Sequence, residues 1–139
     1  MLDYKNQNSW EFESFRMQSP IHIQQKNCTK KPYEKLDVHV EKIMNIFDTE
    51  TGLYYKLKGT SHLLNREFEL NHLHFHTGSE HCLLNQHYLI EAHFVCISEV
   101  GRLAVIAIFF EEGTHNDVFE DLLNNIEDKT TPADITKFL

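Results

Sequence analysis

A chain of 139 residues is long enough to bury the core of one domain, and its 41% hydrophobic and 12% aromatic residues exclude intrinsic disorder. The formal net charge of -8 argues against nucleic acid and against anionic membranes as partners, which leaves small molecules. No apolar run approaches the roughly 20 residues of a membrane helix, and the polar start lacks the pattern of a secretory signal. The sequence therefore predicts a cytoplasmic protein.

No internal repeat or low-complexity linker divides the chain, so we expect a single domain over residues 1–139. The first 35 residues show no sustained apolar period and are expected to be mostly irregular. Five segments with strand character follow: Leu36–Ile46, Gly52–Lys58, Glu67–His76, Tyr88–Ile97 and Leu103–Phe110. They predict a mainly β fold with an antiparallel-rich central sheet.

The last two predicted strands are joined by Ser98–Arg102, a short link with one glycine that is typical of a hairpin. Leu103–Phe110 is apolar on both faces, which predicts a strand in the middle of the fold, covered on two sides. Beyond it, Thr114 or Asn116 can cap a peripheral helix that ends near Asp128. The apolar positions of this helix recur at helical spacing: Val118, Phe119, Leu122, Leu123 and Ile126.

Four of the ten histidines lie in the stretch LNHLHFHTGSEH, which runs from Leu70 to His81. In a strand, alternation places five of the residues in this region on one face: Phe68, Leu70, His72, His74 and His76. The same rule places His93 and Glu91 on one face of the Tyr88–Ile97 strand. Since neighbouring strands lie about 4.8 Å apart, pairing of the two strands would bring His93 against His74 and His76.

Three imidazoles that converge on one ion leave its fourth position open, which is the arrangement of a catalytic zinc site. Water at that position has a pKa of about 7, so hydroxide is available at neutral pH. Glu91 could then orient His93, and His72 could orient His74. The alternative is a set of surface imidazoles on a solvated strand, and the spacing alone does not decide between the two.

Four separated motifs occur in the order found in the core of the α-class carbonic anhydrases, and the chain resembles that family from about Trp10 to Phe138. In this sequence the motifs read QSPIHI, HFHTGSEH, EAHFV and LAV, and they begin at Gln18, His74, Glu91 and Leu103. The resemblance implies a zinc enzyme that hydrates carbon dioxide to bicarbonate, by attack of a zinc-bound hydroxide.

Carried over by position, the resemblance implies that His74, His76 and His93 bind zinc. It implies that Glu91 orients the third ligand and that Glu80 is the catalytic glutamate of the network that orients the hydroxide. Val95 and Val105 match the apolar wall that receives carbon dioxide. His72 stands where the family usually has a glutamine that hydrogen-bonds the first ligand, and His81 is expected to form structural hydrogen bonds.

The resemblance also implies a member shortened at its C-terminus. The family's threonine that accepts from the hydroxide and donates to the glutamate has no counterpart here, and neither does its Leu-Thr-Thr-Pro-Pro pocket wall. We therefore expect a weaker catalyst, and exposed sheet edges that a homodimer would cover. Two alternatives to the enzyme are a non-catalytic relative that binds zinc or a partner, and an inactive fragment of a longer enzyme.

Overall fold

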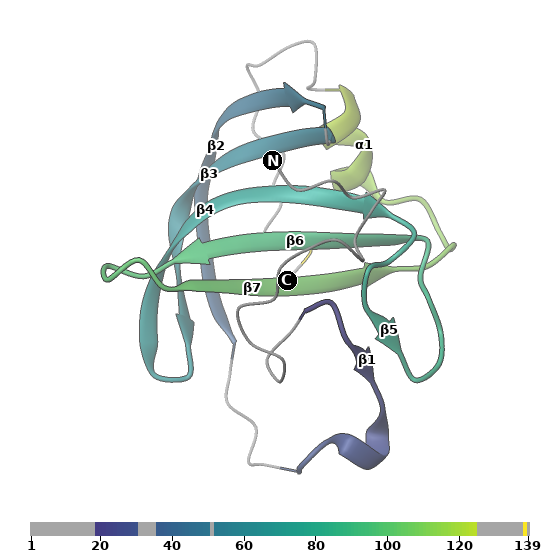
Figure 1. Cartoon of the computed structure of the whole chain (residues 1–139). Helices are drawn as coiled ribbons and strands as arrows, with labels where there is room; N and C mark the ends of the chain where they lie inside the picture. The colour runs from purple at the N-terminus through teal and green to yellow at the C-terminus, as the bar shows by residue number, and fades with distance from the viewer. Residues whose placement is uncertain (1–18, 31–35, 51, 125–137, 139) are drawn as a thin grey trace.

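The computed structural model describes residues 19–30, 36–50, 52–124 and 138, and its main feature is one strongly curved antiparallel sheet (Figure 1). In chain order its elements are β1 His22–Ile23, η2 Gln25–Asn27, β2 Asp37–Thr49, β3 Gly52–Leu63, β4 Arg66–Thr77, β5 Cys82–Leu83, β6 Ile90–Ile97, β7 Leu103–Phe110 and α1 Asp117–Asn124. The five long strands follow the order β2-β3-β4-β6-β7, and β1 pairs with β5 in parallel. The predicted mainly β, antiparallel fold is confirmed.

All five predicted strands are present, and β2 and β3 are longer than predicted. β3 continues through Gly59, where β2 approaches too closely for a side chain. A Cβ at this position would collide with the backbone carbonyl oxygen of His39, so the close pairing requires glycine. The turn that follows consists of Leu64 and Asn65, whose φ angles are 51° and 59°. Two positive φ angles match the twist of a two-residue hairpin, so β3 and β4 pair directly.

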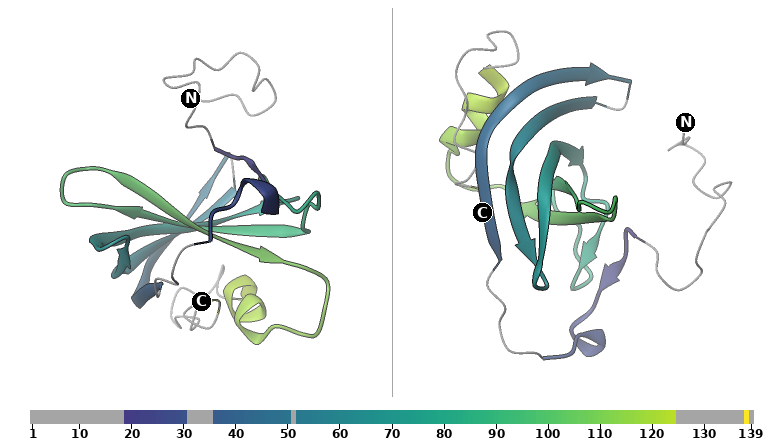
Figure 2. Two further views of the ribbon diagram at one scale, coloured as in Figure 1. Left: turned by 90° about the horizontal axis from the view of Figure 1, so that it is seen from below. Right: turned by 90° about the vertical axis from the view of Figure 1, so that its left-hand side faces the viewer.

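One face of the sheet packs against α1, and Figure 2 shows the helix on that face and the β1 segment on the other. Asn116 caps α1: its Oδ1 accepts the backbone N–H of Phe119 at 3.0 Å, as predicted. Phe119 lies 5.1 Å from Phe75 between ring centroids, and Val118 and Leu122 are buried. The predicted end of the helix near Asp128 lies outside the described residues.

A β-bulge in β4 changes which face two predicted residues occupy. The register shifts between Leu70 and His72, so Leu70 pairs with Cys96 and lies on the core face. Phe68 and Leu70 are 7% and 4% exposed and belong to the core. The prediction that they share a face with the histidines was therefore wrong, because one extra residue in a strand reverses the alternation before it.

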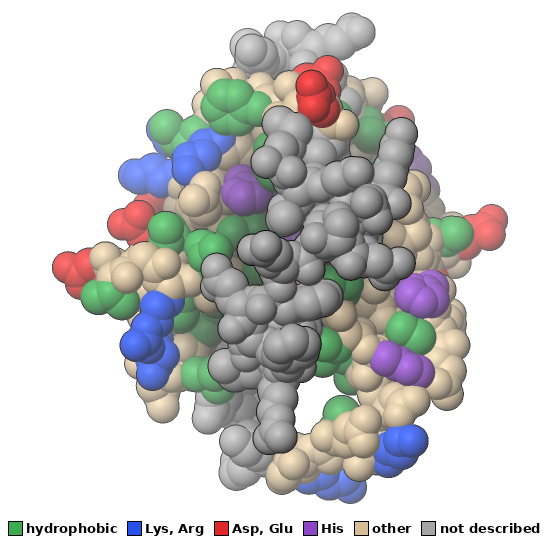
Figure 3. Space-filling model, in the orientation of Figure 1, with side chains coloured by type: hydrophobic (Ala, Val, Ile, Leu, Met, Phe, Trp, Pro, Cys, Tyr) green, Lys and Arg blue, Asp and Glu red, His purple; other side chains and the backbone are tan. Residues whose placement is uncertain are grey.

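β7 differs from its prediction in position. Within the described ranges it lies at the edge of the sheet, with β6 as its neighbour, rather than in the middle of the fold. Its Ile106 is buried in the core, but Leu103 and Val105 on its other face are 69% and 50% exposed. Hydrophobic side chains are visible at the left of Figure 3, where the β6–β7 hairpin projects. An apolar run does not distinguish a strand covered on both faces from one with an open face.

The predicted hairpin between β6 and β7 is confirmed by two backbone hydrogen bonds, from Ser98 N–H to the Arg102 carbonyl and from Gly101 N–H to the Ser98 carbonyl. Gly101 has a φ of 78°, a left-handed conformation that favours glycine. No helix in the described part of the chain is both long and apolar enough to cross a bilayer.

Candidate metal centre

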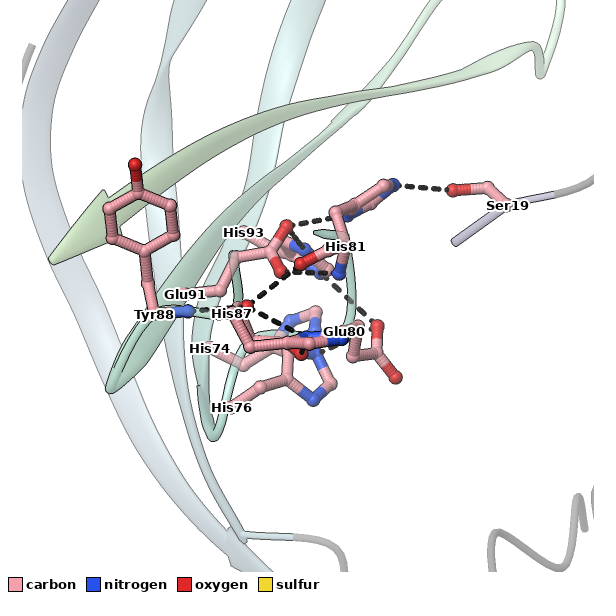
Figure 4. A network of polar contacts seen from close by, with 10 residues as sticks. Ser19, His74, His76, Glu80, His81, His87, Tyr88, Glu91 and His93 are labelled. Carbon is pink, nitrogen blue, oxygen red and sulfur yellow. Dashed lines mark hydrogen bonds and ion pairs between the residues drawn. The ribbon is translucent and has the colours of Figure 1, made fainter. Parts of the chain in front are cut away.

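Three histidines converge where β4 and β6 pair (Figure 4). His74 lies directly opposite His93, and His76 lies opposite Glu91. One ligand nitrogen from each of His74, His76 and His93 lies within 4.8 Å of the others. The structure thus brings together the three residues that the sequence predicts as metal ligands, two from β4 and one from β6.

The segments of β4 and β6 that carry the histidines pack into the hydrophobic core on their opposite face. Side chains that alternate with the histidines point into the core, and Leu73, Ala92 and Phe94 are fully buried. Leu73 lies opposite Phe94 in the β4–β6 register. Because the backbone at these positions is held by pairing and by core packing, the imidazoles on the other face project from a rigid surface.

Burial favours the neutral form of two of the three imidazoles, those of His74 and His76. Burial, followed by the neighbouring rings of His76, His93 and His72, lowers the pKa of His74 to about 3. Burial also lowers the pKa of His76, although the carboxylate of Glu80 opposes this shift. Neutral imidazoles carry the lone pairs that a metal ion needs, so protons do not compete for His74 at neutral pH.

Glu91 fixes the orientation of His93. Its Oε1 lies 2.9 Å from His93 Nε2 and 2.6 Å from His81 Nδ1, and its Oε2 accepts the backbone N–H of His81 at 2.9 Å. Burial alone would raise the pKa of this fully buried carboxyl group, but the hydrogen bonds from His81 and His93 lower it below its ordinary value. The ionised carboxylate therefore accepts the Nε2–H of His93, and in the tautomer that donates this hydrogen the lone pair of the ring lies on Nδ1.

Glu80 reaches the same cluster from the loop between β4 and β6. Its Oε2 lies 3.4 Å from His76 Nε2 and 4.0 Å from His93 Nδ1. The loop is held by Ser79, whose hydroxyl donates to the carbonyl of His81 at 2.8 Å and accepts the backbone N–H of Tyr88 at 2.9 Å. The predicted catalytic carboxylate thus lies beside two of the three predicted ligands, in a partly exposed position.

His72 contacts His74 in a different way from the prediction. The two rings stack, with centroids 5.1 Å apart, and His72 Nδ1 lies 3.4 Å from Asn71 Oδ1. His74 Nδ1 is buried and has no hydrogen-bond partner among the described residues. The structure therefore shows His72 packed against the first predicted ligand, without the expected orienting hydrogen bond.

Val95 and Val105 lie directly opposite each other on β6 and β7, on the face that carries His93. Val95 is partly buried and Val105 is 50% exposed. The pair that the sequence predicts as the substrate wall is therefore adjacent to the cluster but open to solvent at β7.

The arrangement of donors fits a zinc ion. Two nitrogen ligands of tetrahedral zinc, each about 2.0–2.1 Å from the ion, lie about 3.3 Å apart. The Nε2 atoms of His74 and His76 are 3.1 Å apart, close to that spacing. His93 adds a third ring whose Nε2 is already hydrogen-bonded to Glu91, which is the usual environment of a zinc-binding histidine.

The sequence did not reveal the contact between Ser19 and His81. Ser19 Oγ lies 3.0 Å from His81 Nε2, on the side of the ring opposite Glu91. The two residues are 62 positions apart, and the serine lies in a segment without apolar periodicity. The motif QSPIHI was the one feature of the sequence that pointed to this region. Its last two residues form β1, which pairs with β5 directly after His81.

Comparison with known proteins supports the same assignment. The family model for eukaryotic-type carbonic anhydrases matches residues 5–138. This chain belongs to that family. A carbonic anhydrase of Pectobacterium atrosepticum is 34% identical over 107 residues, covering 75% of this chain and 43% of that protein. A carbonic anhydrase of Klebsiella pneumoniae is 32% identical over 105 residues, covering 71% of this chain and 42% of that protein.

Solved structures of carbonic anhydrases share the fold. The α-carbonic anhydrase of Photobacterium profundum matches with a TM-score of 0.71 at 32% identity, covering 84% of this chain and 54% of that one. The α-carbonic anhydrase of Thermovibrio ammonificans, solved with the inhibitor sulfanilamide, matches with a TM-score of 0.72 at 28% identity, covering 77% of this chain and 49% of that one. The chain thus spans about half the length of these carbonic anhydrases.

Proposed function

We propose that this chain hydrates carbon dioxide reversibly to bicarbonate with a zinc ion held by His74, His76 and His93. The observation that carries the proposal is the convergence of three imidazoles on one face of the β4–β6 pair, in a member of the carbonic anhydrase family. Three nitrogen ligands leave zinc with an open position and its full double positive charge.

When bound, zinc would supply a Lewis acid that lowers the pKa of water to about 7. The residues of the chain would position the ion and the substrate. Glu91 holds His93 through Nε2, and Glu80 places a carboxylate 4.0 Å from His93 Nδ1, where it adds a hydrogen-bond acceptor to the edge of the cluster. Val95 offers an apolar surface next to His93, which suits an uncharged substrate such as carbon dioxide.

The test is carbon dioxide hydration by stopped flow, with and without a zinc chelator, on the wild type and on His93→Ala. We expect chelator-sensitive hydration in the wild type and none in the variant. His115→Ala is the matched control, since that histidine is exposed and contacts Asp117 and Glu120 rather than the cluster. Hydration that survives both the chelator and the His93 substitution would contradict the proposal.

A second candidate is a zinc-binding relative without catalysis. The open apolar wall favours it, because Val105 is half-exposed and gives little shelter from water. The same assay separates the two: one zinc per chain without chelator-sensitive hydration would support the non-catalytic protein.

We also propose that a second copy of this chain covers the edge of the sheet. β7 is eight residues long and carries the exposed Leu103 and Val105. Two copies of one strand can pair antiparallel about a two-fold axis, which closes the assembly at two chains. Such a homodimer would bring the apolar residues of the two edges together.

A further inference from the structure

We propose that Ser19 is a positioning residue for the metal centre, which acts on His93 through His81 and Glu91. The inference rests on the proposed zinc site and adds a contribution from the N-terminal part of the chain. Figure 4 shows the row of contacts that connects Ser19 at one end with His93 at the other.

Backbone pairing holds Ser19 in place. His22 and Ile23 in β1 pair in parallel with Cys82 and Leu83 in β5, and the backbone N–H of Cys82 donates to the carbonyl of Ile21 at 3.2 Å. The strand β1 therefore runs beside the residues that follow His81. This pairing carries the serine hydroxyl to the outer nitrogen of the His81 ring, at 3.0 Å.

The direction of each hydrogen bond follows from its acceptor. Ionised Glu91 can only accept, so His81 Nδ1 and His93 Nε2 both carry protons and donate to its Oε1, at 2.6 and 2.9 Å. The other nitrogen of His81, Nε2, lies 3.0 Å from the Ser19 hydroxyl, which donates to it when the ring is neutral. The hydroxyl thus gives His81 a second hydrogen bond, on the side of the ring opposite Glu91.

This series of contacts selects one tautomer for each ring. The serine donor favours His81 with its proton on Nδ1, which is the form that can hold Glu91. Glu91 in turn favours His93 with its proton on Nε2, which leaves Nδ1, 4.0 Å from Glu80, for the metal. Glu91 already requires a proton on His81 Nδ1, so Ser19 adds a second hydrogen bond that holds the ring; without it, the His81 ring and Glu91 are held less firmly.

The same side chains could be taken for a second metal site, because His81, Glu91 and His93 each present a ligand atom within 4.8 Å of the others. Their polar atoms are already used: His81 Nδ1, His93 Nε2 and both oxygens of Glu91 take part in hydrogen bonds. The shortest of these is 2.6 Å, which leaves no room for an ion between the two groups. The geometry thus favours a hydrogen-bonded relay.

Three variants separate the links of the relay. Ser19→Ala removes the donor. His81→Asn keeps an N–H near the position of Nδ1, so it retains the bond to Glu91 and loses the link to Ser19. The double variant combines the two changes. Ser19→Thr retains a hydroxyl donor and is the rescue variant, and Ser98→Ala is the matched control, because Ser98 accepts a backbone N–H in the distant β6–β7 hairpin.

Two readouts are measured on the full chain. Nitrogen-15 NMR of the metal-free protein reports the tautomers of His81 and His93, and competition with a chromogenic chelator gives the zinc dissociation constant. Loss of a direct partner of a zinc ligand costs about 10–100-fold in affinity, so we expect about a threefold to tenfold loss for Ser19, which acts through two residues. We expect Ser19→Ala and His81→Asn to weaken zinc equally, the double variant to be no weaker, and Ser19→Thr to restore wild-type affinity.

A shifted His81 Nε2 resonance in Ser19→Ala, together with weaker zinc binding that Ser19→Thr restores, would support the relay. Unchanged zinc affinity in Ser19→Ala would overturn it and leave the proposed function standing. If the wild type binds no zinc, the proposed function fails, while the His93 tautomer in the metal-free protein still decides whether Ser19 acts on that ring. Two zinc ions per chain, one of them lost in His81→Asn, would replace the relay with a second metal site.

Discussion

The centre and the β7 edge of the sheet differ in how completely their side chains are held. At the centre, His93 is 7% exposed and is fixed by Glu91, which itself has three hydrogen bonds. At the edge, Leu103 and Val105 share the same face and are 69% and 50% exposed. His93 is thus held firmly by described residues, whereas the predicted substrate wall is open.

This difference indicates that the proposed metal binding and the proposed catalysis would depend on different parts of the molecule. The ligands need the β4–β6 pair and the loop that carries Glu80 and His81, all of which the structure describes. Shelter for a substrate needs an additional cover at β7, since water next to the site weakens the electrostatic stabilisation of a reacting group. We therefore expect changes at the centre to affect zinc and changes at the edge to leave it unaffected.

The largest effect is expected from removal of a ligand. Structural zinc sites with four ligands bind with about 10–16 kcal/mol, so His93→Ala should lose about 3–4 kcal/mol, or about a hundredfold to a thousandfold in zinc affinity. Competition with a chelator measures this change. His39→Ala is the control, because His39 lies on β2, away from the cluster. Equal zinc affinity in His93→Ala and the wild type would remove His93 from the site.

A substitution behind the site should separate stability from zinc binding. Leu73 is fully buried on the core face, between His72 and His74 in the chain, so Leu73→Ala should destabilise the fold by about 2–5 kcal/mol. Urea unfolding of the zinc-loaded protein measures the loss. The visible spectrum of the cobalt-substituted variant should keep its wild-type shape below the unfolding transition, and a changed spectrum would show that the core packing controls the ligand geometry directly.

Acid should destabilise the metal-free protein. The pKa of His74 is lowered from 6.5 to about 3, so between these values the unfolded chain binds a proton that the folded chain excludes. The contribution of this group to stability is constant above pH 6.5 and is lost as the pH falls from 6.5 toward 3. Thermal melts in chelator across this range measure the loss, and His74→Phe should flatten the curve. Identical curves for this variant and the wild type would contradict the low pKa.

The smallest effect is expected at the edge. Leu103→Lys replaces an exposed side chain, so the free energy of unfolding should change by less than about 0.5 kcal/mol and zinc affinity should not change. If two copies pair through β7, the added charge should shift the protein toward the monomer in sedimentation velocity. A dimer that persists unchanged in Leu103→Lys would place the contact elsewhere.

The sequence predicted the strands and the ligands well because both follow from local pattern. Alternation placed the histidines of each strand on one face, and the structure shows that these two strands pair with His93 opposite His74. Asn116 was identified as a possible cap from its residue type. The prediction of the face on which Phe68 and Leu70 lie was wrong, because no residue in the sequence marks the position of the bulge. The prediction that β7 is covered on both faces was wrong, because an apolar composition does not show what covers a strand.

The contacts around the site were harder to predict than the ligands. The stacking of His72 on His74, in place of a hydrogen bond, depends on ring orientations that strand periodicity does not determine. The approach of Ser19 to His81 depends on the pairing of two-residue strands far apart in the chain. Such contacts are set by tertiary packing, and only the family's motif hinted at the region involved.

X-ray absorption at the zinc edge of the loaded protein is the most direct test of the central claim, that His74, His76 and His93 form a complete ligand set in this chain. The account predicts one zinc per chain with light-atom ligands at about 2.0–2.1 Å and the multiple scattering of three imidazoles, one of which is lost in His93→Ala. A sulfur ligand at about 2.3 Å, or a spectrum unchanged by the substitution, would contradict it.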